Sequence, residues 1–140
     1  TVIMDGNFKA EHMHDQTPCD QVFLIDGRGY MVVRDRYHEY LKNTNHSMEM
    51  AVNQANMNHH KLKDTGIGEC ACAHHGCFIL HALVNFQKEE NPHRQVNIDY
   101  ALVNALQHNM NGVQWVLTFY DINCQYMKNL YKRIRDSTYL

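Results

Sequence analysis

The sequence predicts a mixed α/β fold in which helices pack on a single sheet. Three observations support this prediction: strand-length apolar runs, amphipathic segments with helical spacing, and the alternation of the two along the chain. The chain has 140 residues, enough for one compact domain with one sizeable core, and only two prolines and seven glycines. We therefore expect one domain over residues 1–140, without a long linker.

Short runs of β-branched and aromatic residues predict the strands. TVIMD and WVLTFYD each end in an aspartate, Asp5 and Asp121, and CFILHALVNF is a further strand candidate. The segment QVFLIDGRGYMVV predicts a β-hairpin with its turn at Asp26 to Gly29.

Three segments have the apolar spacing of amphipathic helices. They cover residues 46–64, 97–109 and 124–136. In the second, Asn97 is a suitable N-cap, Asp99 suits the first turn and Gly112 is a natural stop. In the third, the predicted buried stripe consists of Met127, Leu130, Tyr131 and Ile134. The basic residues that we expect largely off this stripe are Lys128, Lys132, Arg133 and Arg135.

Composition excludes several classes of protein. A formal charge of -2 gives no strong basic field, so tight nucleic-acid binding by bulk charge is not expected. Five cysteines is an odd number, which argues against a disulfide scaffold. No signal peptide opens the chain, and the longest apolar run is too short to cross a bilayer. We expect a reducing compartment and no membrane. Because the chain opens inside an apolar run, we also expect a piece of a longer protein.

The two strand-end aspartates could carry chemistry. If their strands were neighbours, Asp5 and Asp121 would point to one place, where hard oxygen ligands suit Mg²⁺ or Mn²⁺. A pair of such ions supports phosphodiester cleavage and transfer. The competing interpretation is that aspartate ends strands because it starts turns. A phosphatase with a nucleophilic Asp5 would want a second acid two residues on, where this chain has Asn7.

A cluster of cysteine and histidine residues predicts a second metal site. Cys70, Cys72, His75 and Cys77 lie in one short stretch, and four such ligands would close a structural zinc site. Other histidines that could complete the shell are His59, His60, His74 and His81. Alternatively, Cys70 and Cys72 are small buried residues, or Cys72 or Cys77 is the nucleophile of a Cys–His hydrolase that lacks an evident third member.

Six motifs resemble, in order, those of the Kyakuja-Dileera-Zisupton (KDZ) transposases: MDGNFKA, AVNQANMNHHKL, TGIGECACAHHGCF, VNFQK, NIDYAL and FYDINCQY. The resemblance implies an RNase H-like mixed sheet with flanking helices and a DDE-type active site. Its first two acids fall on Asp5 and Asp121, on adjacent parallel strands, and would hold Mg²⁺ or Mn²⁺. It further implies DNA as the partner, a nuclear location, and zinc in a Cys/His-rich insert at about residues 42–77 that contains a helix. The resemblance does not decide whether the protein forms a homo-oligomer.

Several departures from the family pattern matter. The third catalytic acid is expected beyond Leu140, so this chain alone should be inactive as a transposase. His74 stands where the family has arginine, QKEENPHR replaces a QKGER-like segment, and HSMEMAV lacks a cysteine that the family has there. The alternative function is a non-enzymatic relic or repurposed zinc-binding module of transposon origin. A generic RNase H-like nuclease is a third, less specific hypothesis.

Overall fold

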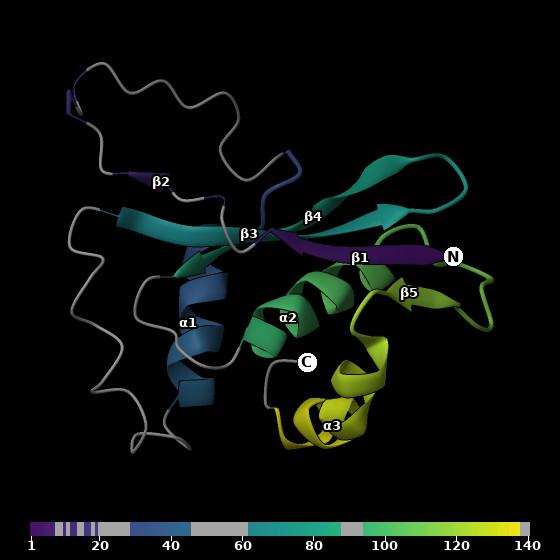
Figure 1. Cartoon of the computed structure of the whole chain (residues 1–140). Coiled ribbons are helices and arrows are strands. Elements are labelled where there is room, and N and C mark those ends of the chain that lie inside the picture. Colours follow the sequence, from purple (N-terminus) through teal and green to yellow (C-terminus); the bar gives the residue numbers. More distant parts are fainter. Residues whose placement is uncertain are drawn as a thin grey trace.

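The structure is a computed structural model of the chain (Figure 1). It describes residues 1–7, 10, 12–13, 16–17, 19, 29–45, 62–87 and 94–137. Within these residues the elements alternate between strands and helices, which confirms the predicted mixed α/β class. None of the helices in this part of the chain is long and apolar enough to cross a membrane.

One mixed sheet forms the centre of the molecule. Its strands are β1 (Val2–Asn7), β2 (His12–Met13), β3 (Leu62–Cys72), β4 (Cys77–Gln87) and β5 (Thr118–Tyr120). The long strand β3 pairs antiparallel with β4 on one edge and with β1 and β2 on the other. β5 pairs with the free edge of β1 and is parallel to it. The sheet therefore runs β4-β3-β1-β5, with β2 beside the far end of β3.

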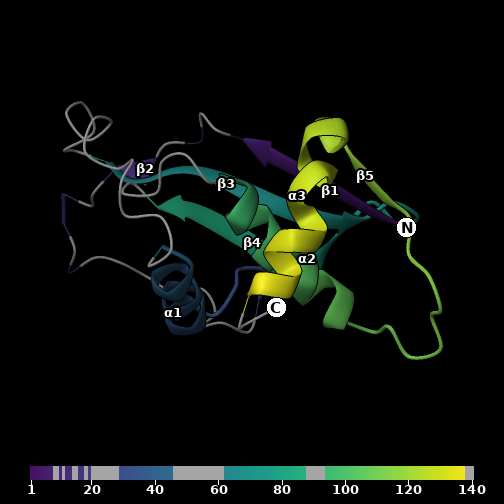
Figure 2. The ribbon, with the colours of Figure 1, turned by 90° about the horizontal axis from the view of Figure 1, so that it is seen from below.

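All three helices lie on one side of this sheet, as Figure 2 shows from below. They are α1 (Arg34–Asn45), α2 (Arg94–Gln107) and α3 (Asn123–Asp136). Strand residues that point toward the helices are buried, among them Val2 and Met4 of β1 and Val84 and Phe86 of β4. The alternation of buried and exposed residues along β1 leaves the other face, with Ile3 and Asp5, toward solvent.

A glycine sets how closely α2 approaches the sheet. A Cβ atom added at Gly68 on β3 would lie 2.6 Å from Ile98 Cδ1 and 2.9 Å from Phe86 Cε1. Ile98 is fully buried, so this contact lies in the middle of the core. The absence of a side chain at Gly68 is therefore what lets Ile98 of α2 and Phe86 of β4 meet over β3.

The NIDY segment of α2 joins the three helices. Tyr37 of α1 donates its hydroxyl to Asn97 Oδ1 at 2.6 Å. The ring of Tyr100 packs against Tyr40 of α1 at 4.8 Å between centroids. Asp99, which is fully buried, accepts two bonds from the guanidinium of Arg133 on α3, at 2.5 Å and 3.0 Å. Side chains from a single turn of α2 thus tie this helix to both of its neighbours.

Some predicted elements differ from those observed. Residues 62–64, expected at the end of a helix over 46–64, instead begin β3, because this stretch pairs with β2 and β4. Residues 46–61 lie outside the described residues. The predicted turn at Asp26 to Gly29 also lies mostly outside the described residues. Where the second strand of that hairpin was expected, the structure has a single parallel bridge between Met31 and Leu83. Helix α1 was not predicted, because the buried side of this helix is built largely from the tyrosines Tyr37 and Tyr40.

The helices α2 and α3 confirm two predicted segments with corrections. α2 starts at Arg94, so Asn97 is inside the helix rather than its N-cap. In α3 the buried residue is Tyr126, whereas Met127 and Tyr131 of the predicted stripe are 49% and 79% exposed. Arg133, expected off the stripe, turns inward. Leu130 of the predicted stripe does pack against the core, and Arg133 joins this inner face because Asp99 on α2 binds it.

Candidate active site

The two aspartates that were predicted at strand ends occupy equivalent positions on neighbouring strands, although β1 continues past Asp5 to Asn7. In the parallel pairing of β1 with β5, Ile3 is the partner of Phe119 and Met4 that of Tyr120. Asp5 and Asp121 follow directly after the last of these pairs. The burial pattern assigns both to the same face, because Met4 and Tyr120 are buried beneath the sheet while both aspartates are exposed. The two carboxylates therefore leave the sheet side by side at one edge.

A short backbone hydrogen bond orients each carboxylate in the same way. The Gly6 N–H donates to Asp5 Oδ1 at 2.7 Å, and the Ile122 N–H donates to Asp121 Oδ1 at 2.7 Å. On the Asp121 side the chain then turns into α3 without a side-chain cap. Asp5, inside β1, and Asp121, in the turn before α3, each use one oxygen to accept the N–H of the next residue, and among the described residues the second oxygen of each remains for another ligand.

A third carboxylate lies in the same row of the sheet. Glu69 on β3 is the direct cross-strand partner of Asp5. Burial, and to a smaller degree the negative charge of Asp5, raises the pKa of the Glu69 carboxyl above its ordinary value. The sequence did not indicate this neighbour, since residues 62–72 lack the apolar alternation of a strand and carry instead the small residues Gly66, Gly68 and Ala71.

The electrostatics of this edge are consistently negative. Burial raises the pKa of the Tyr120 hydroxyl to about 12, and the charges of Asp121 and Asp5 add to that effect. In the part of the chain that the structure describes, neither ion pair of a side chain includes Asp5, Glu69 or Asp121. Like charges are thus adjacent, and no cation among the described residues pairs with them, which favours the binding of a divalent cation.

The carboxylates of Asp5 and Asp121 can supply part of the ligand shell of a hard divalent ion. No three His, Cys, Asp or Glu side chains among the described residues converge closely enough to hold a metal by themselves. Mg²⁺ is ordinarily held by one or two carboxylates and completes its shell with water and substrate oxygens. Asp5 and Asp121 fit that requirement, whereas a closed, all-protein cage is not present in this part of the chain.

The Cys/His cluster forms the end of a β-hairpin. Cys72 closes β3, Cys77 opens β4, and the two are cross-strand partners around a turn in which Gly76 has φ 64°. Cys72 Sγ lies 3.3 Å from His75 Nδ1, and the Cys77 thiol donates to the His75 carbonyl at 3.4 Å. The backbone N–H groups of His75 and His74 lower the pKa of the Cys72 thiol. Cys72 and His75 are thus the pair that the turn brings together.

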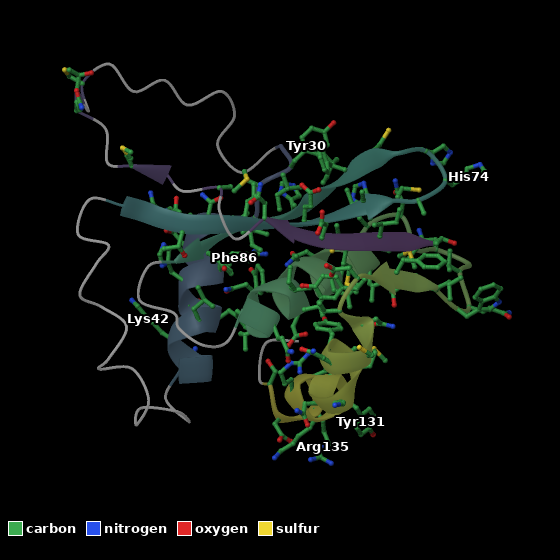
Figure 3. The ribbon with its side chains drawn as sticks, in the orientation of Figure 1. Tyr30, Lys42, His74, Phe86, Tyr131 and Arg135 are labelled. Atoms are coloured by element: carbon green, nitrogen blue, oxygen red, sulfur yellow. The ribbon has the colours of Figure 1, made fainter. Side chains whose placement is uncertain are left out.

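The remaining predicted zinc ligands are placed elsewhere. Cys70 is fully buried in the core, and burial raises the pKa of its thiol to about 12, which opposes the thiolate that zinc binds. His81 Nδ1 instead contacts the Met31 carbonyl at 3.2 Å. His74 lies at the tip of the hairpin (Figure 3), while His59 and His60 lie outside the described residues. The expected insert at 42–77 includes β3, which pairs on both of its edges within the main sheet.

Comparison with known proteins bears on this geometry. The family model of the Kyakuja-Dileera-Zisupton transposases matches residues 1–138. No curated protein and no solved structure gives a significant match. The family match covers both strand-end aspartates, the hairpin and the NIDY segment of α2.

Proposed function

Because this chain belongs to the Kyakuja-Dileera-Zisupton transposase family, we propose that Asp5 and Asp121 are two acids of a DDE-type active site. The chain would be part of an RNase H-like transposase core that cleaves DNA and joins the freed 3′ end to target DNA. The third acid of that site is expected beyond Leu140. Glu69 is not that residue, because it lies on β3 and precedes Asp121 in the sequence.

One observation carries this proposal: the parallel register of β1 and β5. Adjacent parallel strands are what the RNase H-like interpretation requires of the two aspartates, and Asp5 and Asp121 directly follow the paired residues Met4 and Tyr120. The interpretation of both as mere turn residues explains neither why they meet at one edge nor why Glu69 adds a third negative charge there.

The described residues support a division of tasks. The carboxylate oxygens of Asp5 and Asp121 that are not bound to Gly6 and Ile122 would hold two divalent ions with the help of water and DNA phosphate oxygens. Such ions, when bound, activate an attacking oxygen and stabilise a leaving one. The backbone hydrogen bonds and the sheet keep both carboxylates in position, which reduces the cost of ordering them on binding.

Metal binding can be tested by thermal unfolding with Mn²⁺ or Mg²⁺. A ligand at 100 times its Kd stabilises the folded chain by about 2.7 kcal/mol, so the melting temperature of the wild type should rise. Asp5→Asn and Asp121→Asn should each remove most of this rise. Glu39→Gln, at an exposed acid on α1, is the matched control and should keep it. Equal rises in the wild type and in both aspartate variants would contradict the proposal.

The alternative, a repurposed zinc-binding module, draws support from the contact of Cys72 with His75. It predicts stoichiometric zinc in protein purified without chelators, lost in Cys72→Ser, together with no stabilisation by Mn²⁺. A protein with both properties would be a transposase core with structural zinc. Bound zinc, together with no thermal stabilisation by Mn²⁺ that depends on Asp5 and Asp121, would favour the zinc-binding module.

A further inference from the structure

Strand β4 contains a large bulge where it pairs with β3. Glu69 of β3 is the partner of Leu83 on β4. The next pair toward the hairpin turn is Ala71 with Phe78. Between these two pairs β3 advances by two residues and β4 by five, so β4 carries three extra residues within the segment 79–82. Bulges re-aim side chains and occur often beside functional sites.

His81 lies in this bulge with a backbone conformation that is uncommon for residues other than glycine. Its φ is 57°, in the left-handed region. Two hydrogen bonds hold it there: its N–H donates to the Gly29 carbonyl at 3.3 Å, and its ring Nδ1 lies 3.2 Å from the Met31 carbonyl. Because a carbonyl oxygen can only accept, Nδ1 carries a proton. In the neutral imidazole the free lone pair is therefore on Nε2, and the direction of the ring is fixed.

His81 lines a cavity between the bulge and the two helices α1 and α2, which both lie on the helix side of the sheet (Figure 2). The cavity has a volume of about 630 Å³, within the usual range of small-molecule sites. Tyr100 of α2 is buried and forms part of its lining. Among the described residues that line the cavity, the side chains with a permanent charge are Arg36 and Glu39 of α1.

The two charged side chains are available to a ligand. Arg36 and Glu39 are exposed and lie three residues apart, so they are neighbours on one face of α1. In the part of the chain that the structure describes, no ion pair includes either of them. Burial raises the pKa of the Tyr100 hydroxyl, whereas its hydrogen bond with Asn104 and the positive charge of Arg36 lower it. The guanidinium therefore acts on the polar end of Tyr100 inside the cavity.

A cation and an anion that are not paired with each other suit a ligand that carries both charges. A phosphate or another simple anion would be repelled by Glu39, and a simple cation would be repelled by Arg36. In a zwitterion, the carboxylate accepts hydrogen bonds from the guanidinium and the ammonium donates to Glu39, with Nε2 of His81 as a further acceptor. The apolar part of the lining, which can cover an apolar side chain of the ligand, consists of Val33, Leu80 and Val103.

We propose that this cavity binds a small zwitterion with an apolar body, of the class of α-amino acids with a large apolar side chain. The cavity lies among the helices, whereas Asp5 and Asp121 are exposed on the other face of the sheet. The proposal therefore goes beyond the proposed function and does not depend on it.

The first test is an NMR titration of the wild-type chain with L-phenylalanine. A ligand of this size in a cavity with exposed walls should bind with a Kd on the order of 1 mM. The shifts of the amide signals should saturate and should be largest for residues 80–81 and 103–104. If no saturable shift occurs at these amides up to about 20 mM, well above that Kd, the proposal is overturned.

Variants of α1 test the two charged contacts. Arg36→Gln and Glu39→Gln should each weaken the binding of L-phenylalanine about 10-fold, because each removes a charge-assisted hydrogen bond. Arg34→Gln and Asp35→Asn are the matched controls, at exposed residues of the same helix that do not line the cavity, and should bind as the wild type does. Wild-type affinity in both lining variants, or equal losses in the controls, would overturn the proposal.

A variant of the bulge tests the contact with His81. Asparagine tolerates the left-handed conformation, so His81→Asn should keep the fold while it removes the Nε2 acceptor. The loss of one neutral hydrogen bond should weaken binding about 2- to 10-fold. His74→Asn, at the exposed tip of the hairpin, is the control and should have no effect. Unchanged affinity in His81→Asn would show that the bulge does not serve this site, contrary to the proposal.

Analogues of the ligand test whether both of its charges are recognised. Phenylpropanoate lacks the ammonium group and phenethylamine lacks the carboxylate, so each should bind about 10-fold more weakly than L-phenylalanine. Glu39→Gln should strengthen the binding of phenylpropanoate, because it removes a like charge, and Arg36→Gln should do the same for phenethylamine. If either analogue bound as tightly as L-phenylalanine to the wild type, the assignment of a zwitterion would be overturned.

Discussion

The carboxylate of Asp99 and those of Asp5 and Asp121 are in opposite situations. Asp99 is fully buried and receives two hydrogen bonds from Arg133, while Asp5 and Asp121 are exposed at the sheet edge. Among the described residues, no ion pair reaches either strand-end aspartate. The core thus neutralises the charge of Asp99, whereas the edge gathers negative charge that no ion pair of the described residues compensates.

This difference distinguishes a carboxylate that contributes to the packing of the helices from carboxylates that are suited to bind a cation. A buried carboxylate must be paired, because an unpaired charge in the interior costs several kcal/mol, so Asp99 and Arg133 hold the helices together. Carboxylates side by side at an edge repel one another and weaken the fold slightly. Such an arrangement is typical of a site that binds a cation, where part of the stability is given up for function.

The largest effect is expected for Arg133→Ala. It leaves Asp99 buried and without its partner, so the free energy of unfolding should fall by about 3–5 kcal/mol. Urea denaturation measures this change. Arg135→Ala is the control on the same helix, and loss of its exposed pair with Asp136 should cost less than about 1 kcal/mol.

A second substitution tests whether the charge itself is the cause. Adding Asp99→Asn to Arg133→Ala removes the buried charge and should recover part of the lost stability. Equal costs for Arg133→Ala and Arg135→Ala would show that Asp99 does not depend on its partner, and would remove the contrast between core and edge.

An intermediate effect is expected for Gly68→Ala on the packed side of the sheet. The new Cβ would lie 2.6 Å from Ile98 Cδ1, so α2 must move or Ile98 must change its rotamer. Overpacking of this kind costs about 1–3 kcal/mol, again measured by urea denaturation. Gly29→Ala meets nothing within 4 Å and should be close to neutral. A neutral Gly68→Ala would mean that α2 is not tightly seated on β3.

The smallest effect, and one of opposite sign, is expected for Glu69→Gln at the edge. The folded pKa of Glu69 is raised above its ordinary value, so this group favours folding at low pH and loses that contribution as pH rises through the folded pKa. At pH 7 the charged Glu69 is therefore destabilising, and Glu69→Gln should raise stability by less than about 1 kcal/mol.

The pH dependence checks the sign. The advantage of Glu69→Gln over the wild type should shrink as pH falls through the raised pKa of Glu69, because the wild-type carboxyl then becomes protonated. Denaturation in urea from pH 4 to pH 7 measures it. In an Asp5→Asn background the advantage should be smaller, because one source of repulsion is gone. If Glu69→Gln were less stable than the wild type at pH 7, repulsion between the carboxylates at this edge would be contradicted.

The strands that carry the aspartates could be predicted from sequence because their apolar runs are unambiguous. TVIMD and WVLTFYD are rich in β-branched and aromatic residues, which predicts strands; their bounds were less exact, because β1 continues past Asp5 to Asn7 and β5 covers only Thr118–Tyr120. The helices α2 and α3 were predictable for a similar reason, since their apolar residues recur at helical spacing. Segment order and the family motifs follow directly from the chain.

Other features depended on partners that are distant in sequence. β3 is poor in apolar residues and is held by pairing on both edges, so its strand character and the position of Glu69 opposite Asp5 emerge only from the assembled sheet. α1 is built on tyrosines whose partners are Asn97 and Tyr100, about sixty residues away. The inner face of α3 depends on Asp99.

The sequence by itself determined the mixed α/β class, the two aspartates and the family to which the chain belongs, because these depend on local apolar patterns and on the order of motifs. Only the tertiary structure decided that β1 and β5 are parallel neighbours, that Glu69 shares their edge, and that Arg133 turns inward while Lys128 and Lys132 remain outside. The physical reason is that strand pairing and charge compensation are long-range: each is settled by the residue across the sheet or on the next helix, and not by neighbours along the chain.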